Sequence, residues 1–201
     1  MGEPYNCFMR IYIIRHGQTT SDVENRYGGA YDDHLSEEGV RQAKELAEKI
    51  SSFGIQKLFS SSLTRAKESA KILNEKLNVE VEATPNIRER NLYGKLSGMV
   101  RSEAKEKFPE LVEQLRDYRN TIEGAESYED SKKRMIDAFE KIAASNQEAV
   151  AVVTHGGPIK TIFREFLCKE IENVSDCGFA ELEVSNGNVE LIRTEGIEFK
   201  N

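Results

Sequence analysis

The sequence contains few of the residues that build disulfide-linked or zinc-stabilised domains, with three cysteines, four prolines and three histidines among 201 residues. The cysteines, Cys7, Cys168 and Cys177, are odd in number and form no Cys-x-x-Cys pair. This argues against a disulfide framework and a zinc site, and it favours a reducing, cytoplasmic location. The length allows one compact domain with a sizeable core.

Long apolar runs, repeats and linkers are also missing. No apolar run reaches the length that crosses a bilayer, and the first ten residues carry Glu3 without the apolar stretch of a secretory signal. We therefore expect neither membrane association nor secretion. No low-complexity or Gly/Ser/Pro segment divides the chain, so a single domain over residues 1–201 is predicted. Residues 1–8 precede the first predicted strand and are expected to be a dispensable extension.

Positive charge is in the minority. The net charge of −7 disfavours general nucleic-acid binding, because an acidic surface and a phosphate backbone repel each other. A small anion remains a possible ligand, since a local cluster of arginines can hold one on an acidic protein. With nucleic acid and membrane disfavoured, the expected partner is a small molecule.

Apolar runs and helical periodicities alternate along the chain. The fully apolar run 11–14 is typical of a strand that is buried on both faces, and so is 149–154. Two more strands are predicted at 57–60 and 79–83, and a hairpin at 179–184 and 189–193 around Asn186-Gly187. Helices are predicted at 36–50, 63–77, 99–117, 127–145 and 159–167, and an Arg- and Gly-rich loop at 87–98. This alternation predicts an α/β three-layer sandwich, with a mostly parallel central sheet and helices on both faces.

Two of the three histidines occur in the same local context. His16 and His155 each follow a predicted buried strand and precede a glycine. Ligands bind beyond the carboxyl ends of parallel strands, and glycine lets a backbone N–H approach a phosphate oxygen. A single histidine at a strand end would more simply be a satisfied polar residue. The repetition favours one shared site for both.

Arginines and one glutamate complete the candidate site. Arg15 precedes His16, and Arg65 lies where a predicted strand meets a predicted helix, so both arginines suit an anion. Glu89 lies among arginines in the loop at 87–98 and is a candidate acid–base group. The alternative is that Arg65 and the loop are solvated, with ion pairs of little energetic value.

Five ordered blocks together resemble the histidine phosphatase superfamily, the phosphoglycerate-mutase-like family, over nearly the whole chain. They are Arg15-His16-Gly17-Gln18-Thr19, Ser61-Ser62-Leu63-Thr64-Arg65-Ala66, Arg88-Glu89 with Gly94 and Gly98, Gly124-Ala125-Glu126-Ser127 with Arg134, and Val152-Val153-Thr154-His155-Gly156-Gly157. Between the first two blocks, further matching positions are Arg26, Gly29, Asp32, Leu35, Ser36, Gly39, Gln42 and Ala43. A lone Arg-His-Gly would be weak support, whereas ordered blocks with compatible spacing are specific.

The resemblance implies a role for each matching residue. His16 would attack phosphorus in line and become phosphohistidine, while Arg15, Arg65 and His155 would hold the non-bridging oxygens. Glu89 would protonate the leaving oxygen and then accept a proton from water. The remaining expected pocket residues are Gln18, Thr19, Arg90 and the backbone N–H of Gly156. Neither metal nor other cofactor is expected for a phosphatase, because arginine and histidine supply the positive charge.

One position departs from the family pattern Arg-His-Gly-x-Thr-x-x-Asn. Asp22 stands where the asparagine is usual, and an ionised carboxylate cannot donate to a phosphate oxygen. A second negative charge about 4 Å away would cost roughly 4 kcal/mol at an effective dielectric constant of 20. We expect Asp22 to be turned away, paired with a cation, or protonated.

The resemblance leaves three functions open. The favoured function is a phosphatase that hydrolyses small-molecule phosphomonoesters. The first alternative is a phosphoglycerate mutase that depends on 2,3-bisphosphoglycerate, in which Arg90 and Arg101 would bind a substrate carboxylate. The second is a non-catalytic phospho-ligand binding module, which the presence of both His16 and Glu89 disfavours.

Overall fold

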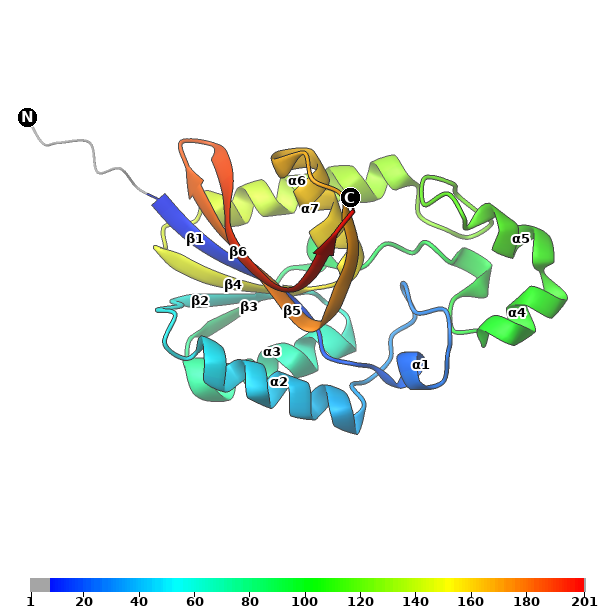
Figure 1. The fold of residues 1–201 in the computed structure, drawn as a ribbon, viewed down its shortest axis with the longest axis horizontal. Helices are drawn as coiled ribbons and strands as arrows, with labels where there is room; N and C mark the ends of the chain where they lie inside the picture. Colours follow the sequence, from blue (N-terminus) through cyan, green and yellow to red (C-terminus); the bar gives the residue numbers. More distant parts are fainter. Residues whose placement is uncertain (1–7, 201) are drawn as a thin grey trace, which may run out of the picture.

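The computed structural model describes residues 8–200, and within them six strands form one sheet (Figure 1). The order across the sheet is β3-β2-β4-β1-β5-β6. The strands are β1 (Phe8–Arg15), β2 (Lys57–Ser60), β3 (Glu80–Ala83), β4 (Ala149–Thr154), β5 (Ile171–Ser185) and β6 (Asn188–Phe199). Residues 1–7 lie outside the described part of the chain, so most of the predicted extension is not tested, although Phe8 is already part of β1.

The four strands β3, β2, β4 and β1 run parallel, and β5 and β6 are added antiparallel at the β1 edge. The mostly parallel α/β sheet is therefore confirmed. β1 and β4 are direct neighbours at its centre, in a register that pairs Arg15 with Thr154. The carboxyl ends of both strands consequently meet at one edge, and the residues that follow them, His16 and His155, are brought together.

Helices cover both faces of the sheet, as Figure 1 shows. The helices are α1 (Thr20–Val23), α2 (Glu37–Ile50), α3 (Thr64–Leu77), α4 (Arg101–Lys107), α5 (Pro109–Gln114), α6 (Tyr128–Ala143) and α7 (Gly156–Leu167). Alternate residues of β1 point to opposite faces: Ile11 and Ile13 pack with α6 and α7, whereas Tyr12 and Ile14 pack with α2 and α3. The predicted three-layer arrangement is thus present.

A smaller apolar cluster lies apart from the sheet, under α4 and α5. Its buried members are Tyr27, Leu96, Ala104 and Ile122. Residues 92–126 contain Leu96, Ala104 and Ile122 of this cluster and form one side of the pocket described below, and we call them the cap segment.

No helix among residues 8–200 is long and apolar enough to cross a membrane.

Three predicted elements differ from the observed ones. The helix predicted at 99–117 is divided into α4 and α5 at Phe108, because the residue before a proline is disfavoured in helical conformation. The predicted hairpin is longer, since β5 begins at Ile171, and register shifts interrupt its alternating pattern. Helix α7 begins at Gly156 instead of Ile159, and Pro158 is tolerated there because N–H groups of a first turn have no helical partner.

Candidate active site

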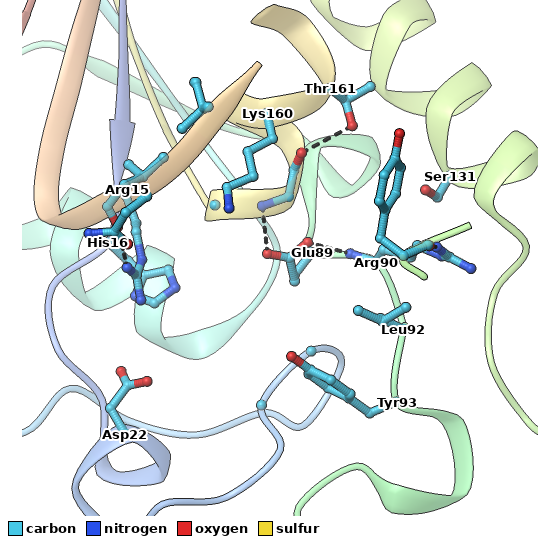
Figure 2. Close-up of a pocket in the computed structure, with 18 of the residues that line it drawn as sticks. Arg15, His16, Asp22, Glu89, Arg90, Leu92, Tyr93, Ser131, Lys160 and Thr161 are labelled. Carbon is cyan, nitrogen blue, oxygen red and sulfur yellow. Dashed lines mark hydrogen bonds between the residues drawn. The ribbon is translucent and has the colours of Figure 1, made fainter. Parts of the chain in front are cut away.

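A pocket of about 500 Å³ opens at the carboxyl ends of β1 and β4 (Figure 2). Its lining includes seven predicted site residues from four separate segments of the chain: Arg15, His16, Thr19, Arg65, Glu89, Arg90 and Gly156. His155 is fully buried and does not itself line the pocket, but its ring centroid is 4.9 Å from that of His16. A distance of more than about 10 Å between the two histidines would have excluded a shared phosphate site. The observed distance is well within that limit, so both rings can contact one phosphate.

His16 is held as one tautomer by two contacts. Its Nδ1 donates to the carbonyl oxygen of Gly17 over 2.8 Å, and its Nε2 accepts from Nε of Arg65 over 3.1 Å. A ring nitrogen that accepts from arginine must carry the lone pair, because the guanidinium has no acceptor. Nε2 of His16 is therefore the unprotonated nitrogen at the pocket.

The loop that carries His16 is packed against the start of α2. A Cβ added to Gly17 would lie 2.5 Å from the carbonyl oxygen of Gly39, so only glycine permits this approach. The backbone N–H of Gly17 donates to Oγ of Ser69 on α3. These contacts fix the backbone of the loop and, with it, the direction of the His16 ring.

Both histidines are buried among cations. Burial lowers the pKa of His16 well below its ordinary value, and the neighbouring charges of Arg65 and Arg15 lower it further. Burial likewise lowers the pKa of His155, and His16 and Arg65 add to the effect. Both rings are consequently neutral at pH 7, and a neutral imidazole is the nucleophilic form. Nε2 of His155 lies 2.7 Å from Oγ of Ser61.

Arg65 is fixed by acceptors on the loop that precedes α2. Its Nη1 donates to Oδ1 of Asp33 and to the carbonyl oxygen of Tyr31, each over 2.8 Å, and its Nη2 donates to the carbonyl oxygen of Gly29. Burial raises the pKa of Asp33, but the hydrogen bond from Ser21 and the Arg65 charge outweigh it, so that the pKa lies below its usual value. Asp33 is therefore an ionised partner that orients Arg65.

Arg15 is oriented by the antiparallel strand β5. Its Nη1 donates to the carbonyl oxygen of Val174, and its Nη2 lies 3.0 Å from Oδ1 of Asp176. The part of β5 that the sequence did not reveal thus holds one of the predicted anion ligands. Sequence reasoning missed Asp176, because nothing in its local pattern links it to a strand end 160 residues earlier.

Glu89 lies in a loop, and its side chain contacts the start of α7 across the pocket from His16 (Figure 2). Its Oε2 accepts from the backbone N–H of Gly157 over 2.9 Å, and its Oε1 accepts from the backbone N–H of Arg90 over 2.8 Å. A Cβ on Gly157 would lie 2.0 Å from Oε1 of Glu89. The second glycine of the His-Gly-Gly block therefore makes room for this carboxylate.

The loop that carries Glu89 is itself held by Arg134 of α6. This guanidinium pairs with both oxygens of Glu126, at 2.6 and 2.7 Å, and donates to the carbonyl oxygens of Asn86, Arg88 and Glu89. Glu126 is therefore committed to Arg134, and it does not line the pocket. Its contribution is to hold the loop in place.

Thr19 and Asp22 form a reciprocal cap at the start of α1. The Thr19 hydroxyl and backbone N–H donate to Oδ2 of Asp22, over 2.8 and 3.0 Å, and the Asp22 N–H donates back to the Thr19 hydroxyl. Such a box satisfies N–H groups that a helix leaves free. Asp22 lines the pocket, yet its carboxylate is held by Thr19 rather than by a cation. The capping interaction accounts for an acidic residue at this position.

Two predicted binding residues have other partners. Gln18 does not line the pocket; its Oε1 accepts from the Ser36 hydroxyl, because the loop turns this side chain toward α2. Arg90 does line the pocket, but its guanidinium donates to three backbone carbonyl oxygens of the cap segment. These carbonyls belong to Tyr118, Asn120 and Glu126. The expectation that Gln18 and Arg90 bind the ligand is therefore not supported by their placement.

Several pocket residues were not predicted as ligands. Lys160 and Arg164 project from successive turns of α7, and Tyr93, Tyr118 and Tyr128 also line the pocket. Lys160 was missed because the predicted helix began at Ile159, whereas the observed α7 includes Gly156, which lies four residues earlier on the same helix face. Arg101, which was considered for a substrate carboxylate, also lines the pocket and stacks on Tyr27 at 4.3 Å from the ring centroid.

A neutral buried histidine with an unprotonated Nε2, fixed arginines beside it and a carboxylate opposite can carry out phosphoryl transfer, which depends on positioning and charge stabilisation. The class is thus a phosphatase or phosphotransferase. The sequence profile described as "Histidine phosphatase superfamily (branch 1)" matches residues 11–197. The chain belongs to this superfamily, as the resemblance of its motifs predicted.

Individual relatives carry names of both phosphatases and mutases. The chain is 35 % identical to the "Metal-independent phosphoserine phosphatase" of Arabidopsis thaliana over 162 residues, which are 76 % of this chain and 66 % of that protein. It is 32 % identical to the "2,3-bisphosphoglycerate-dependent phosphoglycerate mutase 2" of Gloeobacter violaceus over 165 residues, 77 % of this chain and 74 % of that one. The first alignment thus spans slightly less than two thirds of its relative.

The fold is shared with solved structures. A mycobacterial glucosyl-3-phosphoglycerate phosphatase superposes with a TM-score of 0.77 at 25 % identity, covering 92 % of this chain and 97 % of that one. The observed sheet and its helical layers are therefore those of a phosphoglycerate-mutase-like histidine phosphatase.

Proposed function

We propose that the protein hydrolyses small-molecule phosphomonoesters through a phosphohistidine at His16. The observation that carries the proposal is the state of that ring, which is neutral, with its Nε2 lone pair on the pocket side and Nδ1–H held by Gly17. A neutral imidazole so placed is prepared to attack phosphorus in line. The neighbouring Arg15 and Arg65 would balance the charge on the non-bridging oxygens.

The reaction would proceed in two transfers. In the first, Nε2 of His16 bonds to phosphorus, the ester bond breaks, and the leaving oxygen takes a proton from Glu89. In the second, Glu89 accepts a proton from water, the water oxygen bonds to phosphorus, and the phosphohistidine bond breaks to release phosphate. Dividing hydrolysis in this way makes each step easier. His155 and the N–H of Gly156, at the start of α7, would contact the phosphoryl oxygens.

Hydrolysis is favoured over the mutase alternative by the contacts of Arg90. The mutase interpretation used this guanidinium for a substrate carboxylate, but it already donates to three backbone carbonyls. The name of the Arabidopsis relative also supports a phosphatase. For the same reason no bisphosphoglycerate cofactor is proposed. Because arginine and histidine side chains would supply the positive charge, we also expect a metal chelator to leave the turnover of para-nitrophenyl phosphate unchanged.

Labelling with a substrate whose phosphorus is radioactive tests the proposal. The label should be acid-labile and alkali-stable, and His16→Ala should abolish both labelling and turnover. His34→Ala is a matched control, because His34 is exposed and paired with Glu68. Unchanged turnover in His16→Ala would overturn the proposal. A panel that includes 3-phosphoglycerate, with and without 2,3-bisphosphoglycerate, separates phosphate release from conversion to 2-phosphoglycerate.

The setting of the enzyme is part of the same proposal. We propose a cytoplasmic protein that acts on a phosphorylated metabolite. The support is the odd cysteine count, together with a pocket sized for a small molecule.

Cys177 is partly buried, and burial raises the pKa of its thiol to about 12. This cysteine is therefore kept as an unreactive thiol.

A further inference from the structure

Lys160 is a cation of the pocket that the phosphoryl-transfer chemistry leaves unused. It projects from α7 toward the space between Arg15 and Glu89 (Figure 2). Its Nζ donates to the backbone carbonyl oxygen of Glu172 over 2.7 Å. An ammonium group has three donors, so further donors of Lys160 remain available to a ligand.

The charge of Lys160 is not balanced by a close carboxylate. Within residues 8–200 it takes part in no ion pair, whereas the next pocket cation along α7, Arg164, is paired with Glu170 at 2.7 Å. Burial lowers the pKa of Lys160, and the positive charges of Lys200, Arg15 and Arg164 lower it further, against the opposing effect of Glu89. A half-buried cation in excess positive charge gains most from a bound anion.

The transferring phosphoryl group does not account for this cation. Arg15 and Arg65 already flank His16, and each is fixed by its own carboxylate, Asp176 and Asp33. A pocket of about 500 Å³ also holds considerably more than one phosphate. Lys160 is therefore available to a part of the substrate other than the transferring phosphoryl group.

We propose that Lys160 binds a second anionic group of the substrate, so that the preferred substrates are phosphomonoesters that also carry a carboxylate or another phosphate. The proposal rests on the proposed function and extends it to the substrate class. Lys160 acts as a specificity determinant: it contacts the substituent and takes no part in bond breaking. A carboxylate and a phosphate share the relevant chemistry, which is an oxygen anion within reach of the ammonium group.

Matched ligand pairs test this assignment. 3-Phosphoglycerate and glycerol 3-phosphate differ in a carboxylate against a hydroxymethyl group, and propane-1,3-diol bisphosphate and 3-hydroxypropyl phosphate differ in a second phosphate. Each is measured as a competitive inhibitor of para-nitrophenyl phosphate turnover. In the wild type the doubly anionic member should have the lower inhibition constant. Lys160→Met should raise that constant by about tenfold or more, and the constant of its partner by less than about threefold.

Two further variants sharpen the comparison. Lys160→Arg should restore most of the preference, because it keeps the charge. Lys71→Met on α3 removes an exposed lysine that does not line the pocket and should leave all four constants unchanged. An equal loss for both members of a pair would overturn the proposal and assign Lys160 to the transferring phosphoryl group. Unchanged constants for both members would overturn it as well.

The test can succeed or fail independently of the proposed function. If the wild type neither turns over para-nitrophenyl phosphate nor labels His16, the proposed function fails. Calorimetric titration of the same pairs into His16→Ala and into His16→Ala/Lys160→Met still reports the contribution of Lys160 to binding. A preference for the doubly anionic ligand that disappears with Lys160→Met would support the inference. No preference in the first variant would refute it.

Discussion

Nε of Arg65 donates to Nε2 of His16 over 3.1 Å, so the lone pair proposed to attack phosphorus is occupied in the structure. A bound phosphoryl group must replace this contact before the reaction begins. Arg65 then has a second use for the same N–H group, since it can donate to a phosphate oxygen instead. Arg65 would thus fix the His16 ring before the substrate binds and would bind the phosphoryl group afterwards.

Arg65→Lys tests whether the planar guanidinium is required. A lysine carries its three donors on one nitrogen, so it cannot reproduce the four hydrogen bonds that the three guanidinium nitrogens donate to His16, Tyr31, Asp33 and Gly29. We expect kcat/KM for para-nitrophenyl phosphate to fall about 10²-fold, measured by steady-state kinetics. Arg41→Lys is the control, because Arg41 is an exposed arginine paired on α2 with Glu38 and Glu45. A loss no larger than in this control would show that charge alone suffices.

Glu89→Gln should slow the first transfer in a way that depends on the leaving group. An alkyl phosphate leaves as a strongly basic alkoxide and needs a proton, whereas nitrophenolate leaves with little help. Rapid-quench measurement of phosphohistidine formation should show a loss of about 10²–10⁴-fold for the alkyl ester and a much smaller loss for the aryl ester. Breakdown of phosphohistidine should slow equally for both. Equal losses in the first step would make Glu89 a binding residue instead of an acid.

Gly157→Ala should reproduce the Glu89→Gln pattern without changing the acid itself. The added Cβ would lie 2.0 Å from Oε1 of Glu89 and displace the carboxylate. Gly156→Ala is the comparison, because its Cβ would meet no heavy atom within 4 Å. We expect the leaving-group dependence in Gly157→Ala, and a smaller change without that dependence in Gly156→Ala. The same pattern in both would point to the helix terminus and not to Glu89.

The buried histidines predict a loss of stability in mild acid. Because burial lowers their pKa values in the folded state, the unfolded chain binds protons below about pH 6.5 that the folded chain does not. The free energy of unfolding should be fully retained above that pH. As the pH falls below it, the loss should be about 1.4 kcal/mol per pH unit for each histidine, down to the folded-state pKa.

Urea unfolding between pH 5 and 8 measures this slope. The background should be His34→Gln, because Glu68 raises the pKa of His34 and would add stability as the pH falls. In that background, His16→Gln with His155→Gln should flatten the curve between pH 5 and 6.5. A curve of unchanged slope would mean that other groups titrate in that range.

Much of the fold follows from local patterns. Strands β2 and β4 begin and end where the sequence predicts, because their buried runs are bounded by polar residues. Helices α2 and α6 start one residue after the first residues of the predicted helices, Ser36 and Ser127, because the side chains of these serines cap the helices by accepting from backbone N–H groups. The first half of β5 could not be predicted, because a register shift between Val174 and Phe179 breaks the period of two.

The site was predictable where a motif ends a strand and less so elsewhere. His16, Arg65 and Glu89 line the pocket because each lies at an element boundary near the same sheet edge. Gln18 does not line the pocket, and Arg90 lines it with its guanidinium bound to backbone carbonyls; the spacing of neither residue carries a sign of these partners. That the chain forms one domain stays a prediction.

The spacing of the two histidines depends on almost nothing outside the sheet. They follow adjacent parallel strands in fixed register, so backbone hydrogen bonds set their separation. The cap segment contributes Leu92, Tyr93, Arg101 and Tyr118 to the pocket, but it makes no part of that ladder. Evolution or an engineer can therefore change the cap to alter what the enzyme accepts without moving the two histidines, provided that Glu126 is kept, because it pairs with Arg134, which holds the Glu89 loop.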